Sequence, residues 1–189
     1  DMLLLFMIAM FCYLIYLFAI SVFSHGKLVL EDVFATYATV FYIMASFGAL
    51  VMLRDREFGL YLVILTLYGP WISDVFAYFC GRLFGRHKLI PEVSPKKTVE
   101  GLAGGVAAAI FGVLIYCLIL QLFLGFHVNY LLVFLYGIVG SLAGVFGDLT
   151  FSVVKRQTGI KDYGNIFPGH GGILDRFDSV IVVAPLVEA

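Results

Sequence analysis

The residues best suited to chemistry in this sequence lie in one polar stretch, residues 152–178. It contains four basic side chains, three aspartates, one histidine and a Pro-Gly-His-Gly-Gly turn, whereas most of the chain is apolar. Asp175 and Asp178 stand three residues apart, so on a helix they would share one face. Adjacent carboxylates repel unless a cation lies between them, and oxygen ligands of this kind suit Mg²⁺. The spacing therefore predicts a metal site.

Glycine and positive charge in the same stretch favour phosphate as the ligand. The Gly-rich turn at residues 169–172 can bring backbone N–H groups close to a phosphate, because glycine allows tight turns. Lys155, Arg156 and Lys161 supply cations to the same place. His170 could donate a proton, and a role in holding the turn is an equal alternative.

Long apolar segments must hold this stretch in place. The chain has 189 residues, of which 62% are hydrophobic and 13% charged, and its mean hydropathy is +1.02. Soluble domains are about one quarter charged, so we predict an all-α, polytopic integral membrane protein. The apolar runs are continuous and not alternating, which argues against a transmembrane β-barrel. Runs of about 20 residues predict six spans: 2–23, 33–53, 60–85, 101–124, 130–154 and 173–187, the last too short to cross alone.

The spans divide into two parts. Residues 1–59 are predicted to form an N-terminal transmembrane hairpin without a specific motif, and residues 60–189 a catalytic transmembrane domain. Counting spans places the polar loops 86–100 and 155–172 on the same side of the membrane. That side holds ten of the twelve Lys and Arg residues, so the positive-inside rule predicts that it is cytoplasmic.

Glycines recur along the fifth span at three- and four-residue spacing, so they lie on one helical face. This pattern predicts close helix packing through a seam of small residues. The glycines are Gly137, Gly140, Gly144 and Gly147.

Four aspartates lie within or at the ends of the predicted spans: Asp74, Asp148, Asp175 and Asp178. A bare carboxylate in a bilayer costs several kcal/mol, so each should be paired, bound to metal or facing water. At the helical rise per residue, Asp148 lies about 10 Å and Asp74 about 12 Å below the cytoplasmic ends of their spans. The four carboxylates are therefore expected to converge. A structural salt bridge is the alternative for any one of them.

The polar stretch resembles the signature of phosphatidate cytidylyltransferases (CDP-diacylglycerol synthases). That signature reads S-x-x-K-R, four residues, K-D, five residues, P-G-H-G-G, two residues, D-R-x-D, and every fixed position is matched from Ser152 to Asp178. A second block agrees with the family, namely Ser73-Asp74, Ala77-Tyr78, Gly81-Arg82, Phe84-Gly85 and the run S-P-K-K-T-x-E-G at residues 94–101. The resemblance covers roughly residue 60 to the end of the sequence.

The resemblance implies an enzyme of phospholipid biosynthesis that transfers the cytidylyl group of CTP to phosphatidate, giving CDP-diacylglycerol and pyrophosphate. It implies one or two Mg²⁺ ions, a multi-pass place in the inner (cytoplasmic) membrane or its equivalent, and no nucleic-acid partner. A homodimer is an additional hypothesis. The phosphatidate phosphate is already anionic, so the protein needs to neutralise charge and position the substrates more than to supply a strong base.

The resemblance and the residues together assign candidate roles. The catalytic candidates are Asp148, Lys155, Arg156, Lys161, Asp175, Asp178 and His170. The substrate-binding candidates are Asp74, Ser94, Lys96, Lys97, Thr98, Ser152, Gly171, Gly172 and Arg176. The candidate metal ligands are Asp74, Asp148, Asp175 and Asp178.

Other classes of protein remain as alternatives. A related CTP-dependent polyprenol kinase would move the γ-phosphoryl group and release CDP. An ion-coupled transporter would use buried aspartates to bind cations, but it would not need a Lys, Arg and His-Gly-Gly cluster on one side only. The D-G-x-x-A-R pattern of CDP-alcohol phosphotransferases is absent. The density of polar residues argues against a purely structural membrane protein.

Overall fold

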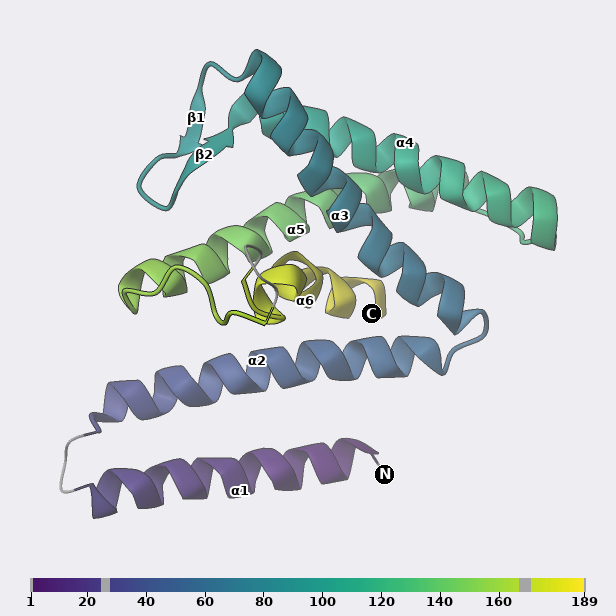
Figure 1. The fold of residues 1–189 in the computed structure, drawn as a ribbon. Helices are drawn as coiled ribbons and strands as arrows, with labels where there is room; N and C mark the ends of the chain where they lie inside the picture. The colour runs from purple at the N-terminus through teal and green to yellow at the C-terminus, as the bar shows by residue number, and fades with distance from the viewer. Residues whose placement is uncertain (1, 25–27, 167–170, 189) are drawn as a thin grey trace. The chain divides into compact units, whose positions relative to one another are not determined.

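The computed structural model describes residues 2–24, 28–166 and 171–188. They form six helices and one short two-stranded sheet (Figure 1), in the order α1 (Met2–Phe23), α2 (Leu30–Arg54), α3 (Gly59–Phe84), β1 (Lys88–Ile90), β2 (Ser94–Thr98), α4 (Val99–Leu124), α5 (Tyr130–Gln157) and α6 (Leu174–Glu188). The chain divides into two compact units, Asp1–Gly48 and Ala49–Ala189. The division at residue 59 that the sequence suggested stays a prediction.

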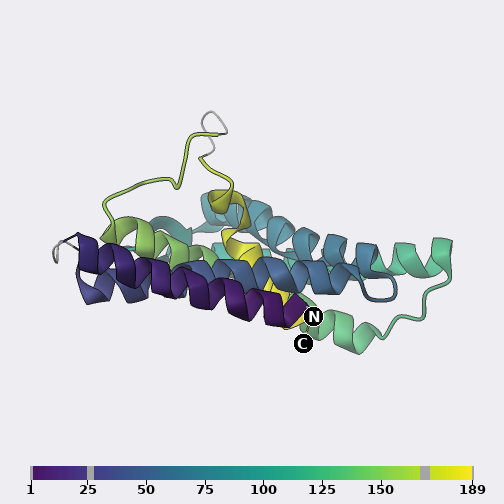
Figure 2. The same ribbon diagram turned by 90° about the horizontal axis from the view of Figure 1, so that it is seen from below.

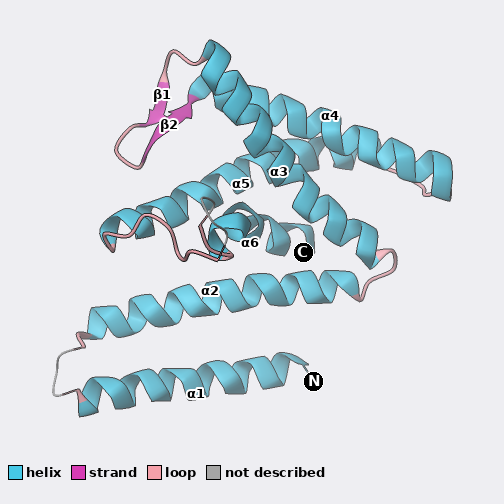
Figure 3. Cartoon of the chain, in the orientation of Figure 1, coloured by secondary structure: helices cyan, strands magenta, loops and turns pink. Residues whose placement is uncertain are grey.

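Helices dominate the described part of the chain, as Figure 3 shows, and five of them are long and apolar enough to cross a membrane. These are Leu3–Phe23, Leu30–Arg54, Gly59–Phe84, Val99–Leu124 and Tyr130–Gln157. Large apolar side chains such as Phe111, Phe123 and Phe146 are exposed on them. Extensive apolar surface of this kind marks contact with lipid or another apolar partner. The predicted all-α polytopic membrane protein is therefore confirmed.

The first unit consists of α1 and most of α2, which contact each other through aromatic rings. The ring centroids of Phe6 and Phe41 lie 5.7 Å apart, and those of Phe18 and Phe34 lie 6.1 Å apart in an edge-to-face arrangement. Aromatic pairs at this spacing add to the stabilisation from buried area. None of the candidate site residues lies in this unit.

The second unit packs α3, α4, α5 and α6 together through small residues. A side chain added at Gly105 would lie 2.7 Å from the carbonyl oxygen of Ser73, and one at Gly137 would lie 2.8 Å from the Cα of Ile110. The seam of Gly137, Gly140, Gly144 and Gly147 is buried along its length, which confirms the predicted packing face. Close backbone approach of this kind is how helices associate in lipid.

Helix α6 is shorter than the five candidate spans and packs against α3 and α5. Its 15 residues extend about 22 Å, less than the hydrocarbon thickness of a bilayer. Val180, Ile181 and Val183 on it are almost completely buried. The helix therefore forms part of the interior of the second unit, and Figure 2 shows the described segment, residues 158–166, that leaves the end of α5 before it.

The polar segment 86–100, for which the sequence predicted only a loop, contains a β-hairpin, and that prediction was wrong in this respect. Strands β1 and β2 pair antiparallel, with Lys88 opposite Thr98 and Ile90 opposite Ser94. The strands are only three and five residues long, too short for periodicity to reveal them. The turn between the strands brings the chain back, so that β2 contacts α3 and leads directly into α4.

Two side chains connect the hairpin to α4. The hydroxyl oxygen of Thr98 accepts a hydrogen bond of 3.1 Å from the N–H of Gly101 and so caps the helix. The Glu100 carboxylate accepts hydrogen bonds from the N–H groups of Arg86 and His87 and lies 2.6 Å from His87 Nδ1. The end of α3, the hairpin and the start of α4 are thus held as one piece, which fixes the direction of β2.

Candidate active site

A cavity of about 660 Å³ opens between α3, the hairpin, α4, α5 and the start of α6. Its volume lies within the range typical of ligand pockets, roughly 300–1,000 Å³. All four aspartates that the sequence singled out line it, and so do four basic residues. The charged lining is Asp74, Asp148, Asp175, Asp178, Arg82, Lys88, Lys96 and Lys97. Both sequence blocks therefore meet at one place, although they lie on separate elements.

Lys97 and Asp148 form an ion pair across the cavity. Lys97 comes from β2 and Asp148 from α5, and Lys97 Nζ lies 2.5 Å from Asp148 Oδ2. The ammonium nitrogen is buried, and it donates no hydrogen bond to the described residues. Asp148 also accepts a 3.3 Å hydrogen bond from the Ser152 hydroxyl one turn further along α5. The ion pair holds the Lys97 ammonium group at the cavity wall, while the N–H donors of that group make no hydrogen bond to the described residues.

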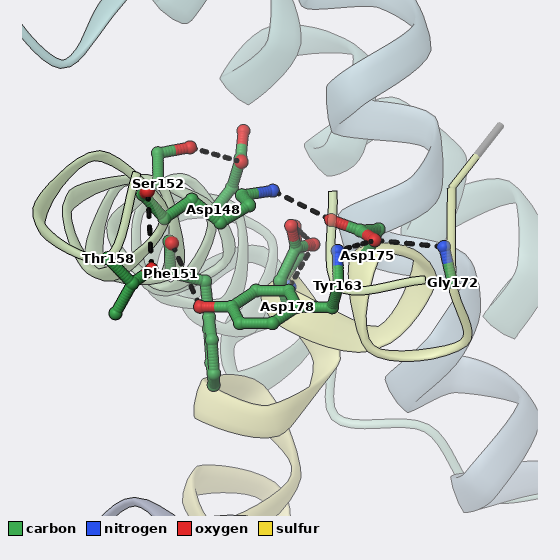
Figure 4. Close-up of polar contacts among 10 residues, drawn as sticks. Asp148, Phe151, Ser152, Thr158, Tyr163, Gly172, Asp175 and Asp178 are labelled. Carbon is green, nitrogen blue, oxygen red and sulfur yellow. Dashed lines mark hydrogen bonds and ion pairs between the residues drawn. The ribbon is translucent and has the colours of Figure 1, made fainter. Parts of the chain in front are cut away.

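Asp175, at the start of α6, is hydrogen-bonded to residues at both ends of the loop 155–172, here called the signature loop, as Figure 4 shows. Its Oδ1 accepts a 2.8 Å hydrogen bond from Lys155 Nζ. Its Oδ2 accepts bonds from the N–H groups of Tyr163 at 2.8 Å and Gly172 at 2.9 Å. The side chain of Asp175 is only 4% exposed and that of Lys155 13%. One carboxylate therefore joins the end of α5, the loop and the glycine turn.

Gly171 leaves room for the Asp175 carboxylate. The hydrogen bonds that this carboxylate accepts are here called the Asp175 clamp. The φ of Gly171 is +83°, in the region that favours glycine, and an added Cβ would lie 2.8 Å from Asp175 Oδ2. The predicted phosphate-binding role of Gly171 and Gly172 is not tested by this arrangement. Both glycines have a local role in the clamp, because Gly172 donates a hydrogen bond to Asp175 and Gly171 leaves room for the carboxylate.

Tyr163, which the sequence analysis did not single out, supports the same clamp. Its hydroxyl donates a 3.1 Å hydrogen bond to the carbonyl oxygen of Phe151, and Lys155 Nζ lies 5.3 Å from the ring centroid. Burial, helped by the charges of Asp175 and Asp178, raises the pKa of Tyr163 to about 12. A tyrosine in the signature loop gives no distinct sequence signal, because the family pattern leaves this position variable.

The pKa of Asp175 lies below its ordinary value. Burial acts to raise it, but the hydrogen bond from Lys155 and those from the N–H groups of Gly172 and Tyr163 together outweigh burial. Asp175 is therefore held as a carboxylate.

A second polar network joins α3 and α6 through Ser179. The Ser179 hydroxyl lies within hydrogen-bond distance of Asp74 Oδ2, at 3.1 Å, and of Asp178 Oδ1, at 3.4 Å. Its N–H donates to Asp178 Oδ1 at 2.8 Å. Asp178 is buried, with 7% of its surface exposed. Sequence reasoning missed Ser179; its position directly after the last aspartate of the signature is the signal that could have indicated it.

The aspartates suit a metal ion by their chemistry, but they do not form a ready ligand set. Within residues 2–24, 28–166 and 171–188, no three His, Cys, Asp or Glu side chains lie close enough together to hold a metal ion. Asp148 and Asp175 are engaged by Lys97 and Lys155. Asp74 and Asp178 each keep one oxygen that accepts no hydrogen bond from the described residues. Carboxylate oxygens facing one cavity fit a hard divalent cation.

The remaining candidates are distributed unevenly. Ser94, Lys96, Ser152, Lys155, Arg156 and Lys161 line a smaller cavity of about 250 Å³. Thr98 lines the main cavity, with its hydroxyl engaged as the cap of α4. Arg176 is not among the residues that line either cavity, and its carbonyl oxygen accepts a 3.4 Å bond from Trp71 Nε1. His170 lies outside the described residues.

Membrane-length helices around a cavity lined by four acidic and four basic side chains define a polytopic membrane protein with a charged site. The model of the cytidylyltransferase family matches residues 2–189, and the chain belongs to this family.

Curated relatives are similar over most of this chain. A phosphatidate cytidylyltransferase of Staphylococcus epidermidis is 44% identical over 141 residues, which are 75% of this chain and 53% of the relative. That of Staphylococcus haemolyticus is 39% identical over 172 residues, 91% of this chain and 64% of the relative. That of Bacillus subtilis is 41% identical over 155 residues, 82% of this chain and 56% of the relative. The chain thus spans between 53% and 64% of the length of these relatives.

Proposed function

We propose that the protein transfers the cytidylyl group of CTP to phosphatidate, giving CDP-diacylglycerol and pyrophosphate. One observation carries the proposal: side chains of both signature blocks, on β2, α5 and α6, line a single cavity between membrane-length helices. Relatives that carry the name phosphatidate cytidylyltransferase support it.

The reaction is a displacement at phosphorus. An oxygen of the phosphatidate phosphate forms a bond to the α-phosphorus of CTP. The bond from that phosphorus to the oxygen bridging to the β-phosphate breaks, and its electron pair leaves with pyrophosphate. Lys97 and Lys155 contribute fixed positive charge, since each is held by an aspartate before any substrate arrives. Charges that are already in position do not have to reorganise during the reaction.

A metal ion is part of the proposal. One or two Mg²⁺ ions would be held by Asp74, Asp148, Asp175 and Asp178, and when bound they would offset the charge of the reacting phosphates. Asp74 and Asp178 support this assignment, because each has one carboxylate oxygen that accepts no hydrogen bond from the described residues. Asp148 and Asp175 would join such a site only by giving up contacts to their lysines.

The cavity is proposed to face the cytoplasm and to open sideways to the bilayer. The positive-inside count supports a cytoplasmic position for loops 86–100 and 155–172, and CTP is a cytoplasmic nucleotide. Phosphatidate keeps its acyl chains in the bilayer, so its head group must enter between helices. This need explains why a cytidylyltransferase would be built from membrane-spanning segments.

Position-specific labelling of CTP tests the function. The protein, in membranes containing phosphatidate and Mg²⁺, is given CTP labelled at either the α- or the γ-phosphate. The expected result is α-label in the lipid and γ-label in pyrophosphate. Label from the γ-position in a lipid phosphate, with release of CDP, would indicate the polyprenol kinase alternative. No labelled lipid from either nucleotide, together with cation flux, would indicate a transporter. Asp55→Asn, an exposed carboxylate outside the cavity, is the matched control for aspartate variants.

A further inference from the structure

Asp74 differs from the other three aspartates of the main cavity in how its carboxylate is held. Asp148 and Asp175 each form an ion pair with a lysine, and Asp178 accepts a hydrogen bond from the N–H of Ser179. Asp74 forms no ion pair with the described residues. The Ser179 hydroxyl, 3.1 Å from Asp74 Oδ2, is its one hydrogen-bond donor in the part of the chain that the structure describes. A carboxylate of α3 is therefore oriented by a residue of α6.

Tight packing fixes Ser179 itself. The residue is 2% exposed. A Cβ added at Gly144 would lie 3.6 Å from the Cβ of Ser179, and one added at Gly147 would lie 3.3 Å from its Cα. The glycine seam of α5 thus lies directly against this residue of α6. A serine oxygen has only three staggered positions on a fixed backbone, and the position observed here lies against Asp74.

The hydroxyl and the N–H of Ser179 serve different carboxylates. A hydroxyl group carries one proton, so it donates to one acceptor at a time. The shorter contact, 3.1 Å to Asp74 against 3.4 Å to Asp178, favours Asp74. Asp178 keeps the 2.8 Å hydrogen bond from the backbone N–H of Ser179. Removing the hydroxyl therefore frees the Asp74 carboxylate to turn and leaves the N–H bond to Asp178 in place.

We propose that Ser179 is a positioning residue, whose hydroxyl holds the Asp74 carboxylate in the direction from which it helps to bind a divalent cation. The inference rests on the metal-assisted cytidylyl transfer proposed above and deepens it. Residues that hydrogen-bond to metal ligands orient those ligands, and losing one typically lowers metal affinity about 10- to 100-fold. The alternative is that Ser179 only joins α3 to α6, in which case its loss would affect stability and not metal affinity.

Metal binding by the purified protein tests the proposal without requiring turnover. Ser179→Ala removes the hydroxyl and keeps the N–H that bonds to Asp178. Ser141→Ala is the matched control, because Ser141 is also buried, its hydroxyl donates to the carbonyl oxygen of Ile138 within α5, and it lines neither cavity. Affinity for Mn²⁺ is measured from its paramagnetic signal in detergent, without substrates. Ser179→Ala should bind Mn²⁺ about 10- to 100-fold more weakly than wild type, and Ser141→Ala should bind it equally well.

Two further measurements separate positioning from packing. Thermal unfolding in EDTA should place Ser179→Ala close to Ser141→Ala, since each variant loses one buried hydroxyl. The loss of Mn²⁺ affinity in Ser179→Ala should not exceed that in Asp74→Asn, because Ser179 is proposed to act through Asp74. A larger loss than in Asp74→Asn would show that Ser179 acts on some other group and would overturn the proposal.

Other outcomes would also overturn it. Unchanged Mn²⁺ affinity in Ser179→Ala, with or without a lower unfolding temperature, would reduce Ser179 to a packing residue. So would failure of Ser179→Ala to fold when Ser141→Ala folds. A wild type that binds no Mn²⁺ would reject the metal site and this inference together. Lipid labelled from α-labelled CTP, with Mn²⁺ affinity unchanged in Ser179→Ala, would reject the inference alone. The expected loss of Mn²⁺ affinity without labelled lipid would reject cytidylyl transfer and leave the role of Ser179 standing.

Discussion

Replacing Asp175 by Asn tests whether the Asp175 carboxylate holds the signature loop in place or acts only as a metal ligand. The carboxylate accepts hydrogen bonds from Lys155 and from two backbone N–H groups on either side of the loop. Asn can keep an acceptor on one side only, and it removes the charge opposite the ammonium group of Lys155, whose side chain is 13% exposed. Breaking a buried pair costs roughly 3–5 kcal/mol. Because Asn retains part of the bonding, the expected loss of stability is about 2–3 kcal/mol.

The assay follows thermal unfolding in detergent with EDTA present, so that no divalent metal contributes. Trp71 is the only tryptophan, and its indole N–H contacts the carbonyl oxygen of Arg176 on α6, so its fluorescence reports on the packing of α3 against α6. Asp175→Asn should unfold at a clearly lower temperature than wild type, and Asp55→Asn should not. A variant as stable as wild type in EDTA would refute the clamp, because a pure metal ligand loses nothing when no metal is bound.

The same clamp has a pH dependence whose sign follows from the pKa of Asp175. That pKa is lower in the folded protein than in the unfolded chain, so the stabilisation is present above the unfolded value, about 4, and is lost as the pH falls through the folded pKa. The difference in unfolding temperature between wild type and Asp175→Asn should therefore shrink in acid. A difference that grew as the pH fell would contradict the assignment.

Three further outcomes are expected. Single cysteines at Lys88 and Gln157 should both escape an impermeant thiol reagent in sealed cells, and labelling of either from outside would contradict the cytoplasmic orientation. Gly171→Ala should impair stability more than Gly159→Ala, because both glycines have positive φ but only at Gly171 would the added Cβ meet Asp175. Equal effects would show that glycine is needed at residue 171 only for its positive φ. Asp178→Asn should insert normally yet lose nearly all turnover and Mn²⁺ binding in parallel, and retention of both would place the metal elsewhere.

The helices were predictable from the sequence because their signal is strong. Continuous apolar runs have one stable form in a bilayer, and the observed α3 (Gly59–Phe84) and α5 (Tyr130–Gln157) begin within one residue of the predicted spans. The convergence of the four aspartates on one cavity was also predictable, since depth along a helix follows from its rise. Which carboxylate meets which cation was not, because pairing depends on rotation of each helix about its axis.

The β-hairpin and the hydrogen bonds of Ser179 could not be predicted from the sequence. Strands of three and five residues carry too few side chains for a period of two to be recognised. Ser179 is hydrogen-bonded to Asp74, 105 positions away. Its place directly after Asp178 could have marked it as a candidate, but nothing local at either position indicates that the two are partners. Such contacts depend on how α3 and α6 pack, which a single sequence does not reveal.

The contact between Asp74 and Ser179 also bears on how the protein is made. Ribosomes synthesise α3 long before α6, so Asp74 enters the bilayer at a time when its hydrogen-bond partner does not yet exist. An unpaired carboxylate in lipid costs several kcal/mol, and the nascent helix must meet that cost by remaining near water or near the insertion machinery. Helix α6, which is synthesised after α3, α4 and α5, completes the polar interior, so the site can assemble only once α6 has been inserted.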